Sequence, residues 1–230
     1  MVKKAGAQTL AGDVYERLRA AILAGRFHAG EWLRPAEICA EYGVSASVVR
    51  EALMRLAEQK LAVLSPNRGY HVLTFRDRDV RELVEFRVIN ETAAFRLSIE
   101  RGDVEWEGEV LAAHHRLKTA ASGDGVGSDA WFVAHAALHL ALLDACGNDL
   151  LLETCRDSLA AGDLYLRWHR RESGVEPGKT VGGRAVDLEH AAMVDAALAR
   201  DADRAAQLYR DHLQRTADTI AAMRRAPIET

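Results

Sequence analysis

Four histidines in the later part of the chain fall where a helical pattern would otherwise place core residues. His135 and His139 stand four residues apart in an apolar stretch, so both lie on one face of a predicted helix. His190 and His212 each continue the apolar stripe of a later helix. Buried imidazoles are costly unless their nitrogens find partners. Two to four imidazoles can bind a divalent transition metal, and Zn(II) or Ni(II) are the ions that we expect.

The spacing of the last two histidines around a turn favours a single site. Asp201 is the centre of the predicted turn, and His190 and His212 each lie 11 residues from it. In an antiparallel helical hairpin, equal offsets put two residues at the same height, roughly 16 Å from the turn at about 1.5 Å per residue. We therefore expect all four histidines to bind one metal ion. The alternative is a hydrogen-bonded polar core that holds no metal.

One arginine also interrupts an apolar stripe. Arg87 falls among the inward positions of a helix predicted over 77–101. A guanidinium removed from water needs an anion close by. That anion is either Glu91, one helical turn further on, or the carboxylate of a small-molecule effector, which a guanidinium can hold through two donors. Both interpretations remain open at the level of the sequence.

These polar residues belong to a long helical region that begins at Asp77. Helical periodicity dominates from there on, and the breaks carry Gly or Asp. The predicted helices cover about 77–101, 103–122, 128–146, 148–172, 182–200 and 203–224. So much amphipathic helix predicts an antiparallel all-α bundle with its own core over 77–230.

Residues 1–76 follow a different pattern. After a first helix and a turn-rich connection over 26–33, a short helix from Pro35 ends at Gly43, where a left-handed cap is needed. A third helix follows Ser45 as its N-cap. Two short apolar runs around a turn then predict a β-hairpin. This order predicts a winged helix-turn-helix, so the fold class is mainly α: a DNA-binding domain over 1–76 followed by the helical bundle.

The expected DNA contacts follow from that motif. The third helix would enter the major groove by its N-terminal end, where Ser45, Ser47 and Arg50 point outward. Arg50 is the best candidate for guanine or phosphate, because its guanidinium offers two donors in a fork. Arg68 at the hairpin tip and Arg34 before the second helix are further candidates. The alternative for each arginine is a solvated surface residue.

The composition excludes several classes of protein. A hydrophobic fraction of 49% and a charged fraction of 28% are those of a globular chain. We find no membrane span and no secretion signal, and we expect a cytoplasmic protein with reduced, buried cysteines at positions 39, 146 and 155. Residues 1–76 hold eleven Lys/Arg and seven Asp/Glu, so they carry +4 of the total of −4 and the rest carries −8. This asymmetry suits a small nucleic-acid module joined to an acidic domain.

The chain also resembles a known family. Residues 9–76, with VYERLRAAILAGRFHAGEWLRPAEICAEYGVSASVVREALMRLAEQKLAVLSPNRGYHV, strongly resemble the DNA-binding domain of the GntR family. The bundle resembles the FCD-type ligand-binding domain of the FadR-like branch in its segments ELVEFRVINETAAFRL, HLALLDACGNDLL and EHAAMVDAALARDADRAAQLYRDHL.

The resemblance implies a site of one Asp and three His that binds a metal, which helps to hold a small organic acid. By position the three histidines are His139, His190 and His212, and His135 stands where the family has the Asp. Four neutral ligands leave more positive charge at the site, which favours an anionic effector. Arg87 matches the family's inward arginine, which supports its role as an effector ligand.

The resemblance therefore implies a metabolite-responsive transcription regulator rather than an enzyme. We expect a homodimer, because a two-fold protein matches a two-fold double-stranded operator. Repression that a small carboxylate effector relieves is the expected mode. Ala36 and Ala46 stand where similar proteins often carry arginine, which implies either an operator unlike the common family site or a larger share of the affinity from phosphate contacts. The alternatives are a metal-dependent hydrolase, although HAALH lacks the Glu of H-E-x-x-H, and a DNA-binding regulator without metal.

Overall fold

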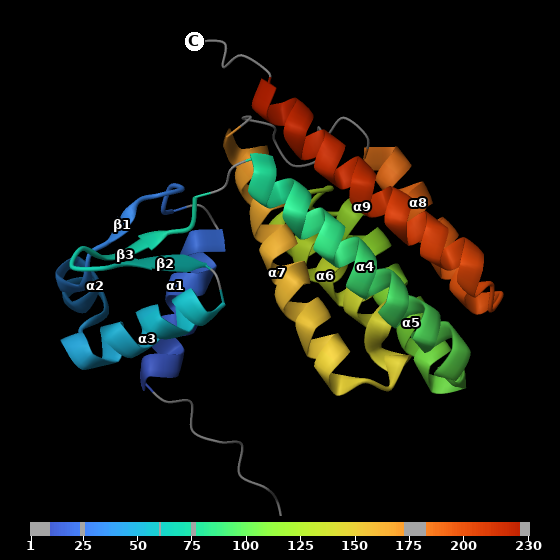
Figure 1. Ribbon diagram of the computed structural model, residues 1–230, viewed down its shortest axis with the longest axis horizontal. Helices are drawn as coiled ribbons and strands as arrows, with labels where there is room; N and C mark the ends of the chain where they lie inside the picture. The colour runs from blue at the N-terminus through green and yellow to red at the C-terminus, as the bar shows by residue number, and fades with distance from the viewer. Residues whose placement is uncertain (1–9, 24–25, 60, 75–76, 173–182, 226–230) are drawn as a thin grey trace, which may run out of the picture. The chain divides into compact units, whose positions relative to one another are not determined.

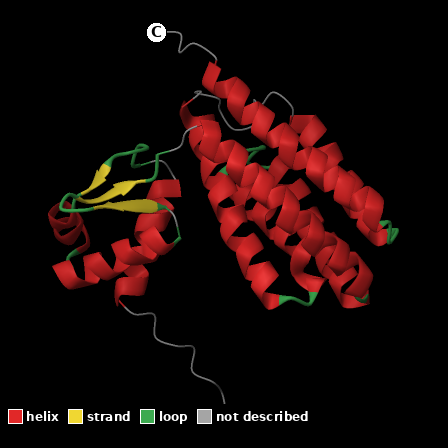
Figure 2. Ribbon diagram, in the orientation of Figure 1, coloured by secondary structure: helices red, strands yellow, loops and turns green. Residues whose placement is uncertain are grey.

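A computed structural model describes residues 10–225 except 24–25, 60, 75–76 and 173–182. The chain forms two compact units, Met1–Phe75 and Arg76–Thr230. The first combines helices with a small sheet, and the second is helical (Figures 1 and 2). The boundary expected after residue 76 falls beside residues that lie outside the described part.

Three helices build most of the first unit: α1 (Leu10–Leu23), α2 (Pro35–Tyr42) and α3 (Ala46–Glu58). Pro35 suits the first turn of α2, and Gly43 ends that helix with a φ of 66°, a left-handed cap as expected. Ser45 precedes α3, but its side chain makes no capping hydrogen bond. Ser45 is thus the N-cap residue of α3, as expected, but its Oγ lies 2.9 Å from Oγ of Ser47 instead of accepting from a backbone N–H.

A three-stranded antiparallel sheet completes the first unit. The predicted hairpin is present as β2 (Ala62–Ser65) and β3 (Gly69–Val72). A further strand, β1 (Trp32–Leu33), pairs with β3, so the strand order is β1-β3-β2. The connection over 26–33 was expected to be turn-rich, and no strand was predicted in it. Two residues are too few to show the alternation by which a strand is read from sequence.

The second unit consists, within its described residues, of long α-helices and one short 3₁₀ turn. These are α4 (Asp77–Arg101), α5 (Val104–Ser122), α6 (Asp129–Leu143), η1 (Asp144–Cys146), α7 (Asp149–Glu172), α8 (Gly183–Leu198) and α9 (Ala202–Arg225). The helix expected over 128–146 divides at Leu143, because the last turn tightens to 3₁₀ before Gly147 takes a left-handed φ of 63°.

The core of the second unit lies between these helices, with α4 packed against α7 and α9. Leu138 and Leu142 of α6, Phe95 of α4 and Tyr209 of α9 are fully buried. Cys146 and Cys155 are buried free thiols. Cys39 in the first unit is only half-buried, contrary to expectation. Among the described residues, none of the helices has the length and apolarity needed to cross a membrane.

Candidate metal centre

Three helices bring the four predicted histidines into one buried cluster. His135 and His139 come from α6, His190 from α8 and His212 from α9. One ring nitrogen from each lies within 4.8 Å of those of the others. The four residues are 6%, 0%, 0% and 3% exposed, respectively. Their grouping provides the number and type of ligands that a tetrahedral transition-metal site requires.

The hairpin of α8 and α9 places its two histidines side by side. The ring centroids of His190 and His212 lie 4.7 Å apart. Helix α8 ends and helix α9 begins at the turn around Asp201. Because His190 and His212 are equally far from that turn along the chain, they lie at about the same height in the helical hairpin. His135 and His139, one turn apart on α6, have ring centroids 4.4 Å apart. The helical repeat thus brings His135 and His139 together, and the turn between α8 and α9 brings His190 and His212 together.

The inner nitrogens of these rings face one another. Nε2 of His139 lies 3.1 Å from Nε2 of His135 and 3.4 Å from Nε2 of His190. A neutral imidazole nitrogen carries either one hydrogen or one lone pair, so Nε2 of His139 can share one hydrogen with only one of these neighbours. The remaining nitrogens repel one another unless a cation lies between them. The donor set therefore fits a divalent metal.

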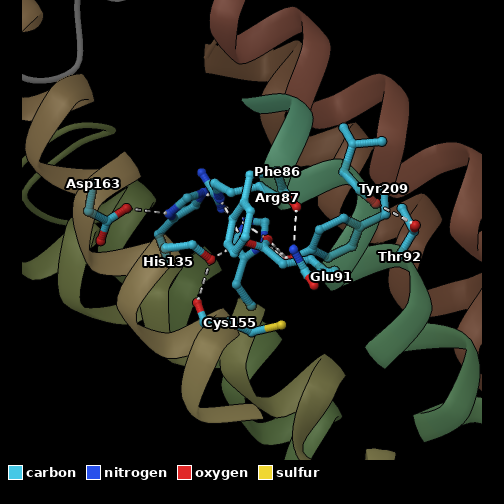
Figure 3. A network of polar contacts seen from close by, with 12 residues as sticks. Phe86, Arg87, Glu91, Thr92, His135, Cys155, Asp163 and Tyr209 are labelled. Atoms are coloured by element: carbon cyan, nitrogen blue, oxygen red, sulfur yellow. Dashed lines mark hydrogen bonds and ion pairs between the residues drawn. The ribbon is translucent and has the colours of Figure 1, made fainter. Parts of the chain in front are cut away.

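The outer nitrogens of three of the four rings, those of His212, His139 and His135, lie near polar groups outside the cluster. Nδ1 of His212 lies 2.8 Å from a carboxylate oxygen of Glu189, and Nδ1 of His139 lies 2.8 Å from the hydroxyl of Tyr209. Nδ1 of His135 lies 3.5 Å from Oδ1 of Asp163 (Figure 3). Histidines that ligate metals almost always have such a partner on the second nitrogen, which orients the ring and fixes its tautomer.

Arg87 is paired inside the protein, beside the cluster. Its Nε and Nη2 donate to the two carboxylate oxygens of Glu91 at 2.6 and 3.1 Å. The hydroxyls of Tyr209 and Ser158 also donate to Glu91, at 2.8 and 3.2 Å (Figure 3). Of the two anions that the sequence offered for Arg87, the structure therefore shows Glu91 in place.

Burial favours the neutral form of three of the imidazoles, those of His139, His190 and His212. Burial, and then the neighbouring imidazoles, lower the pKa of His139 and of His190 well below the ordinary value. Burial also lowers the pKa of His212, although its hydrogen bond to Glu189 opposes the shift. Neutral imidazoles have the free lone pair that a metal requires, so these rings do not need to lose a proton near neutral pH.

Tyr209 and Arg87, which donate hydrogen bonds to Glu91 next to His139, both stay protonated. Burial, and then the charge of Glu91, raise the pKa of Tyr209 well above its ordinary value, so its hydroxyl stays protonated. Burial lowers the pKa of Arg87, but the charge and the hydrogen bonds of Glu91 raise it by more, so the net shift is upward and the guanidinium stays charged. Arg87 and Glu91 thus form a buried ion pair with a fixed geometry.

The predicted DNA-binding residues lie on the surface of the first unit. Ser45, Ser47 and Arg50 are exposed at and near the N-terminal end of α3, the end expected to enter the major groove. The buried side of the same helix is formed by Val49, Ala52, Leu53 and Leu56. The face that the sequence analysis assigned to DNA is therefore free of the core.

The two other candidate arginines are exposed but have partners within the first unit. Arg34 lies directly before α2, and its Nη1 is 3.1 Å from a carboxylate oxygen of Glu37. Arg68 lies in the turn between β2 and β3, with its guanidinium 4.7 Å from the ring centroid of Trp32. A surface ion pair of this kind is weak, so it leaves Arg34 available to a phosphate.

Sequence reasoning missed several residues around the cluster. Tyr209 is buried on α9, three residues before His212, but no role was predicted for it and its hydroxyl was not given a partner. Since a buried tyrosine hydroxyl usually has one, that position was a usable indication. Trp131 stacks on His135 at 4.6 Å between ring centroids and lies four residues before it on α6, so the helical repeat was a usable indication there too. Glu189 and Asp163 had no pattern of their own, and only the packing of separate helices reveals them.

Two family descriptions match the two parts of the chain. Residues 10–72 match "Bacterial regulatory proteins, gntR family", and residues 82–215 match "FCD domain". Two solved structures share the fold: E. coli McbR/YncC, with a TM-score of 0.76 and 18% identity over 93% of this chain and 98% of that one, and a GntR transcriptional regulator from Rhodococcus sp. RHA1, with 0.75 and 24% over 92% and 97%.

Curated relatives extend over nearly the same length. The HTH-type transcriptional regulator BphR of Paraburkholderia xenovorans (strain LB400) is 33% identical over 94% of this chain and 87% of its own length. The HTH-type transcriptional repressor GlaR of Escherichia coli (strain K12) is 30% identical over 87% and 91%. The chain therefore belongs to the GntR family of DNA-binding transcription regulators, with an FCD domain as in the FadR-like branch.

Proposed function

We propose that the second unit is a metal-dependent sensor of a small organic acid and that it controls operator binding by the first unit. The observation that carries this proposal is the buried group of four imidazoles, whose ligand atoms lie within 4.8 Å of one another. Nε2 of His139 lies 3.1 and 3.4 Å from Nε2 of His135 and His190 and can share a hydrogen with only one of them, so a cation would stabilise the group. His135, His139, His190 and His212 would hold Zn(II) or Ni(II), ions that suit nitrogen ligands.

The metal would supply a positive centre to which an anionic effector can bind. Four neutral imidazoles do not reduce the charge of a divalent ion, unlike a set that includes a carboxylate. Arg87 places a guanidinium beside the cluster, close enough to lower the pKa of His139 and of His212, and Glu91 balances its charge in the absence of an effector. We therefore propose a carboxylate effector that binds the metal.

Arg87 is the candidate second contact for that effector. Two of its nitrogens are held by Glu91, and the third, Nη1, lies against Gly162 of α7. An effector carboxylate would bind through Nη1 or would replace Glu91. Either event would disturb contacts between α4, α7 and α9, which is how binding at the metal would change the arrangement of the helices.

Operator binding would use two copies of the chain. We propose a homodimer, because one winged helix-turn-helix covers few base pairs and two-fold operators match two-fold proteins. Arg50, Ser45 and Ser47 would meet the major groove, with Arg34 and Arg68 on the backbone. The effector can change DNA affinity only by binding the two conformations differently. Repression relieved by the effector is the proposed mode, and GlaR is a relative named as a repressor.

The test combines metal analysis with ligand screening of the full chain. Protein purified without chelator should contain about one equivalent of Zn or Ni per chain by mass spectrometry of the elements. A thermal-shift screen of small mono- and dicarboxylates should find ligands that raise the Tm of the metal-loaded protein but not of the chelated protein. Those ligands should then lower the affinity for an operator selected from random double-stranded DNA.

Each other outcome identifies a different function. Less than half an equivalent of metal, with no gain in Tm on adding Zn(II) or Ni(II), indicates a regulator whose histidines form a polar core. Metal binding with turnover of an ester or carboxylate substrate indicates a hydrolase. A carboxylate that binds equally well with and without metal refutes the metal's role in sensing, although DNA binding would stand.

A further inference from the structure

We propose that Glu91 and Tyr209 are positioning residues that fix the tautomer of His139, with hydrogen on Nδ1 and a free lone pair on Nε2. The inference rests on the proposed metal site for its purpose, but the tautomer itself is a property of the metal-free protein. It assigns a role to a buried network that lies one layer outside the histidines and joins α4, α7 and α9 (Figure 3).

The carboxylate of Glu91 is surrounded by donors. Arg87 donates two hydrogen bonds to it and the hydroxyl of Tyr209 donates one. The hydroxyl of Ser158 shares its one hydrogen between Glu91, at 3.2 Å, and the carbonyl oxygen of Cys155, at 3.0 Å. Glu91 is 0% exposed, so water does not compete for these positions. An ionised carboxylate can only accept hydrogen bonds. Every group that faces Glu91 must therefore turn a hydrogen toward it.

Tyr209 has only one hydrogen to give. Its hydroxyl oxygen lies 2.8 Å from Oε2 of Glu91 and 2.8 Å from Nδ1 of His139. Because the single hydrogen points to Glu91, the oxygen presents a lone pair to His139. A stable contact at 2.8 Å then requires that Nδ1 of His139 carries the hydrogen. The direction of both hydrogen bonds is thus set by Glu91.

The consequence lies on the opposite side of the His139 ring. A neutral imidazole with hydrogen on Nδ1 has none on Nε2. Nε2 is the atom that faces His135 and His190 at 3.1 and 3.4 Å. The network therefore directs a lone pair into the centre of the cluster, which is the form of His139 that can ligate a metal.

A carboxylate also fixes the tautomer of His212, but through a direct hydrogen bond. Glu189 accepts directly from Nδ1 of His212 at 2.8 Å and also pairs with Nε of Arg215 at 2.6 Å. For His139 the carboxylate acts through an intervening hydroxyl instead. The intermediate hydroxyl makes a specific prediction possible, because a hydroxyl can reverse its direction when its acceptor is removed.

The first measurement is the tautomer in the metal-free full-length protein. Nitrogen-15 NMR separates a protonated from an unprotonated imidazole nitrogen, and His139→Gln identifies the signals of His139. We expect hydrogen on Nδ1 in the wild type. In the double variant Arg87→Met/Glu91→Leu no unpaired buried charge remains, and the Tyr209 hydroxyl is free to donate to His139. The hydrogen of His139 should then move to Nε2.

The second measurement is metal affinity, by competition with a chelating dye. Tyr209→Phe keeps the ring that packs on Phe95 but removes the acceptor of Nδ1. We expect the affinity for Zn(II) to fall roughly 10- to 100-fold, as is usual when such a partner is lost. The double variant should show a comparable loss although all four histidines and Tyr209 are intact.

Ser98→Ala is the matched control. Ser98 is a fully buried residue on α4, like Glu91, and its hydroxyl donates to the carbonyl of Ala94 away from the cluster. It should leave both tautomer and affinity unchanged. Wild-type protein with hydrogen on Nε2 of His139 overturns the inference, even if no variant folds. If the wild type has hydrogen on Nδ1 of His139 but binds no metal, the proposed function is refuted, whereas the inferred direction of the hydrogen bonds from His139 to Tyr209 and from Tyr209 to Glu91 is correct.

Discussion

The Nε2 atoms of His135 and His139 lie 3.1 Å apart in a part of the core that excludes water. Only a shared hydrogen or a cation makes such a contact between two neutral rings favourable. Nε2 of His190 is a further neighbour of His139, at 3.4 Å. A metal ion would convert this strained group into a set of ligands, so metal binding should add to the free energy of unfolding.

His190→Ala should therefore lower metal content and metal-dependent stability together. In the wild type, a free metal concentration about 1,000 times the Kd adds about 4 kcal/mol to the free energy of unfolding. The variant should lose most of that gain, because three ligands bind more weakly than four. Elemental analysis and thermal unfolding with and without Zn(II) measure both quantities.

The matched control for this prediction is His114→Ala on α5. His114 is half-buried and lies outside the group of four. It should keep both the metal and the gain in stability. A His190→Ala protein that retains one equivalent of metal and the full gain would show that the four rings do not share an ion.

The metal-free protein should lose stability as the pH falls below about 6.5. In the unfolded chain a histidine titrates near pH 6.5, whereas burial lowers the pKa of His139 and of His190 in the folded state. Below pH 6.5 the unfolded state thus binds more protons than the folded state, and the free energy of unfolding falls as the pH falls. Each such histidine lowers the free energy of unfolding by up to about 1.4 kcal/mol for each pH unit below 6.5, and it has little effect well above that pH.

Urea unfolding of chelated protein at pH 7.5 and 5.5 measures this dependence. Carboxylates elsewhere also titrate, so the variant His139→Gln/His190→Gln is needed for comparison. Its loss of stability between the two pH values should be smaller than that of the wild type. An equal loss in both proteins would mean that the histidines are not the groups that bind the protons.

Two helical glycines should respond oppositely to alanine. A Cβ at Gly162 of α7 would clash with Nη1 of Arg87 and lie 3.1 Å from its Cζ. The guanidinium would have to leave Glu91, so Gly162→Ala should destabilise the protein by about 1–3 kcal/mol. A Cβ at Gly108 of α5 meets nothing within 4 Å. Gly108→Ala should stabilise it by about 0.5–1 kcal/mol through helix propensity.

Urea unfolding of both variants is the measurement, and the opposite signs make each one the control of the other. The Zn(II) affinity of Gly162→Ala should also fall, because Arg87 and Glu91 support His139. If Gly162→Ala is as stabilising as Gly108→Ala, the guanidinium is free to move and the buried pair is not fixed.

The parts of the site that were predictable from sequence are those that one periodicity determines. The spacing of His135 and His139 needs only the helical repeat, and that of His190 and His212 needs only one turn between two helices. The order of helices and the hairpin of the first unit followed from caps, turns and apolar runs. The two-residue strand β1 did not, since it exists only through its pairing with β3.

The support around the site could not be predicted, because it depends on which faces of distant helices meet. Glu91 was recognised as a possible partner of Arg87, since both lie on α4 one turn apart. Its contacts with Tyr209 and Ser158 cross to α9 and α7. The periodicity of one helix does not show how three helices are rotated relative to one another. The hydrogen bonds that connect Glu91, Tyr209 and His139 could therefore be recognised only in the structure.

Arg50→Ala should weaken operator binding by roughly 10-fold or more without changing the fold. The side chain is exposed near the N-terminal end of α3, beside Ser47, and faces away from the core. A guanidinium that binds a guanine typically contributes about 1–3 kcal/mol and its loss relaxes specificity at one base pair. If Arg50 binds a phosphate instead, its loss reduces the salt dependence of binding by about one counterion. Titrations at several salt concentrations, on the selected operator and its single-base variants, distinguish the two contacts.

The control for Arg50 is Arg210→Ala, which removes an exposed arginine from α9 of the second unit. Both variants lose one positive charge, so any effect of net charge on DNA affinity is common to them. Only Arg50→Ala should show the larger loss, with unchanged circular dichroism and metal content. Equal affinities for the two variants would mean that this face of α3 does not contact DNA, and the residues that read the operator would have to be sought elsewhere in the first unit.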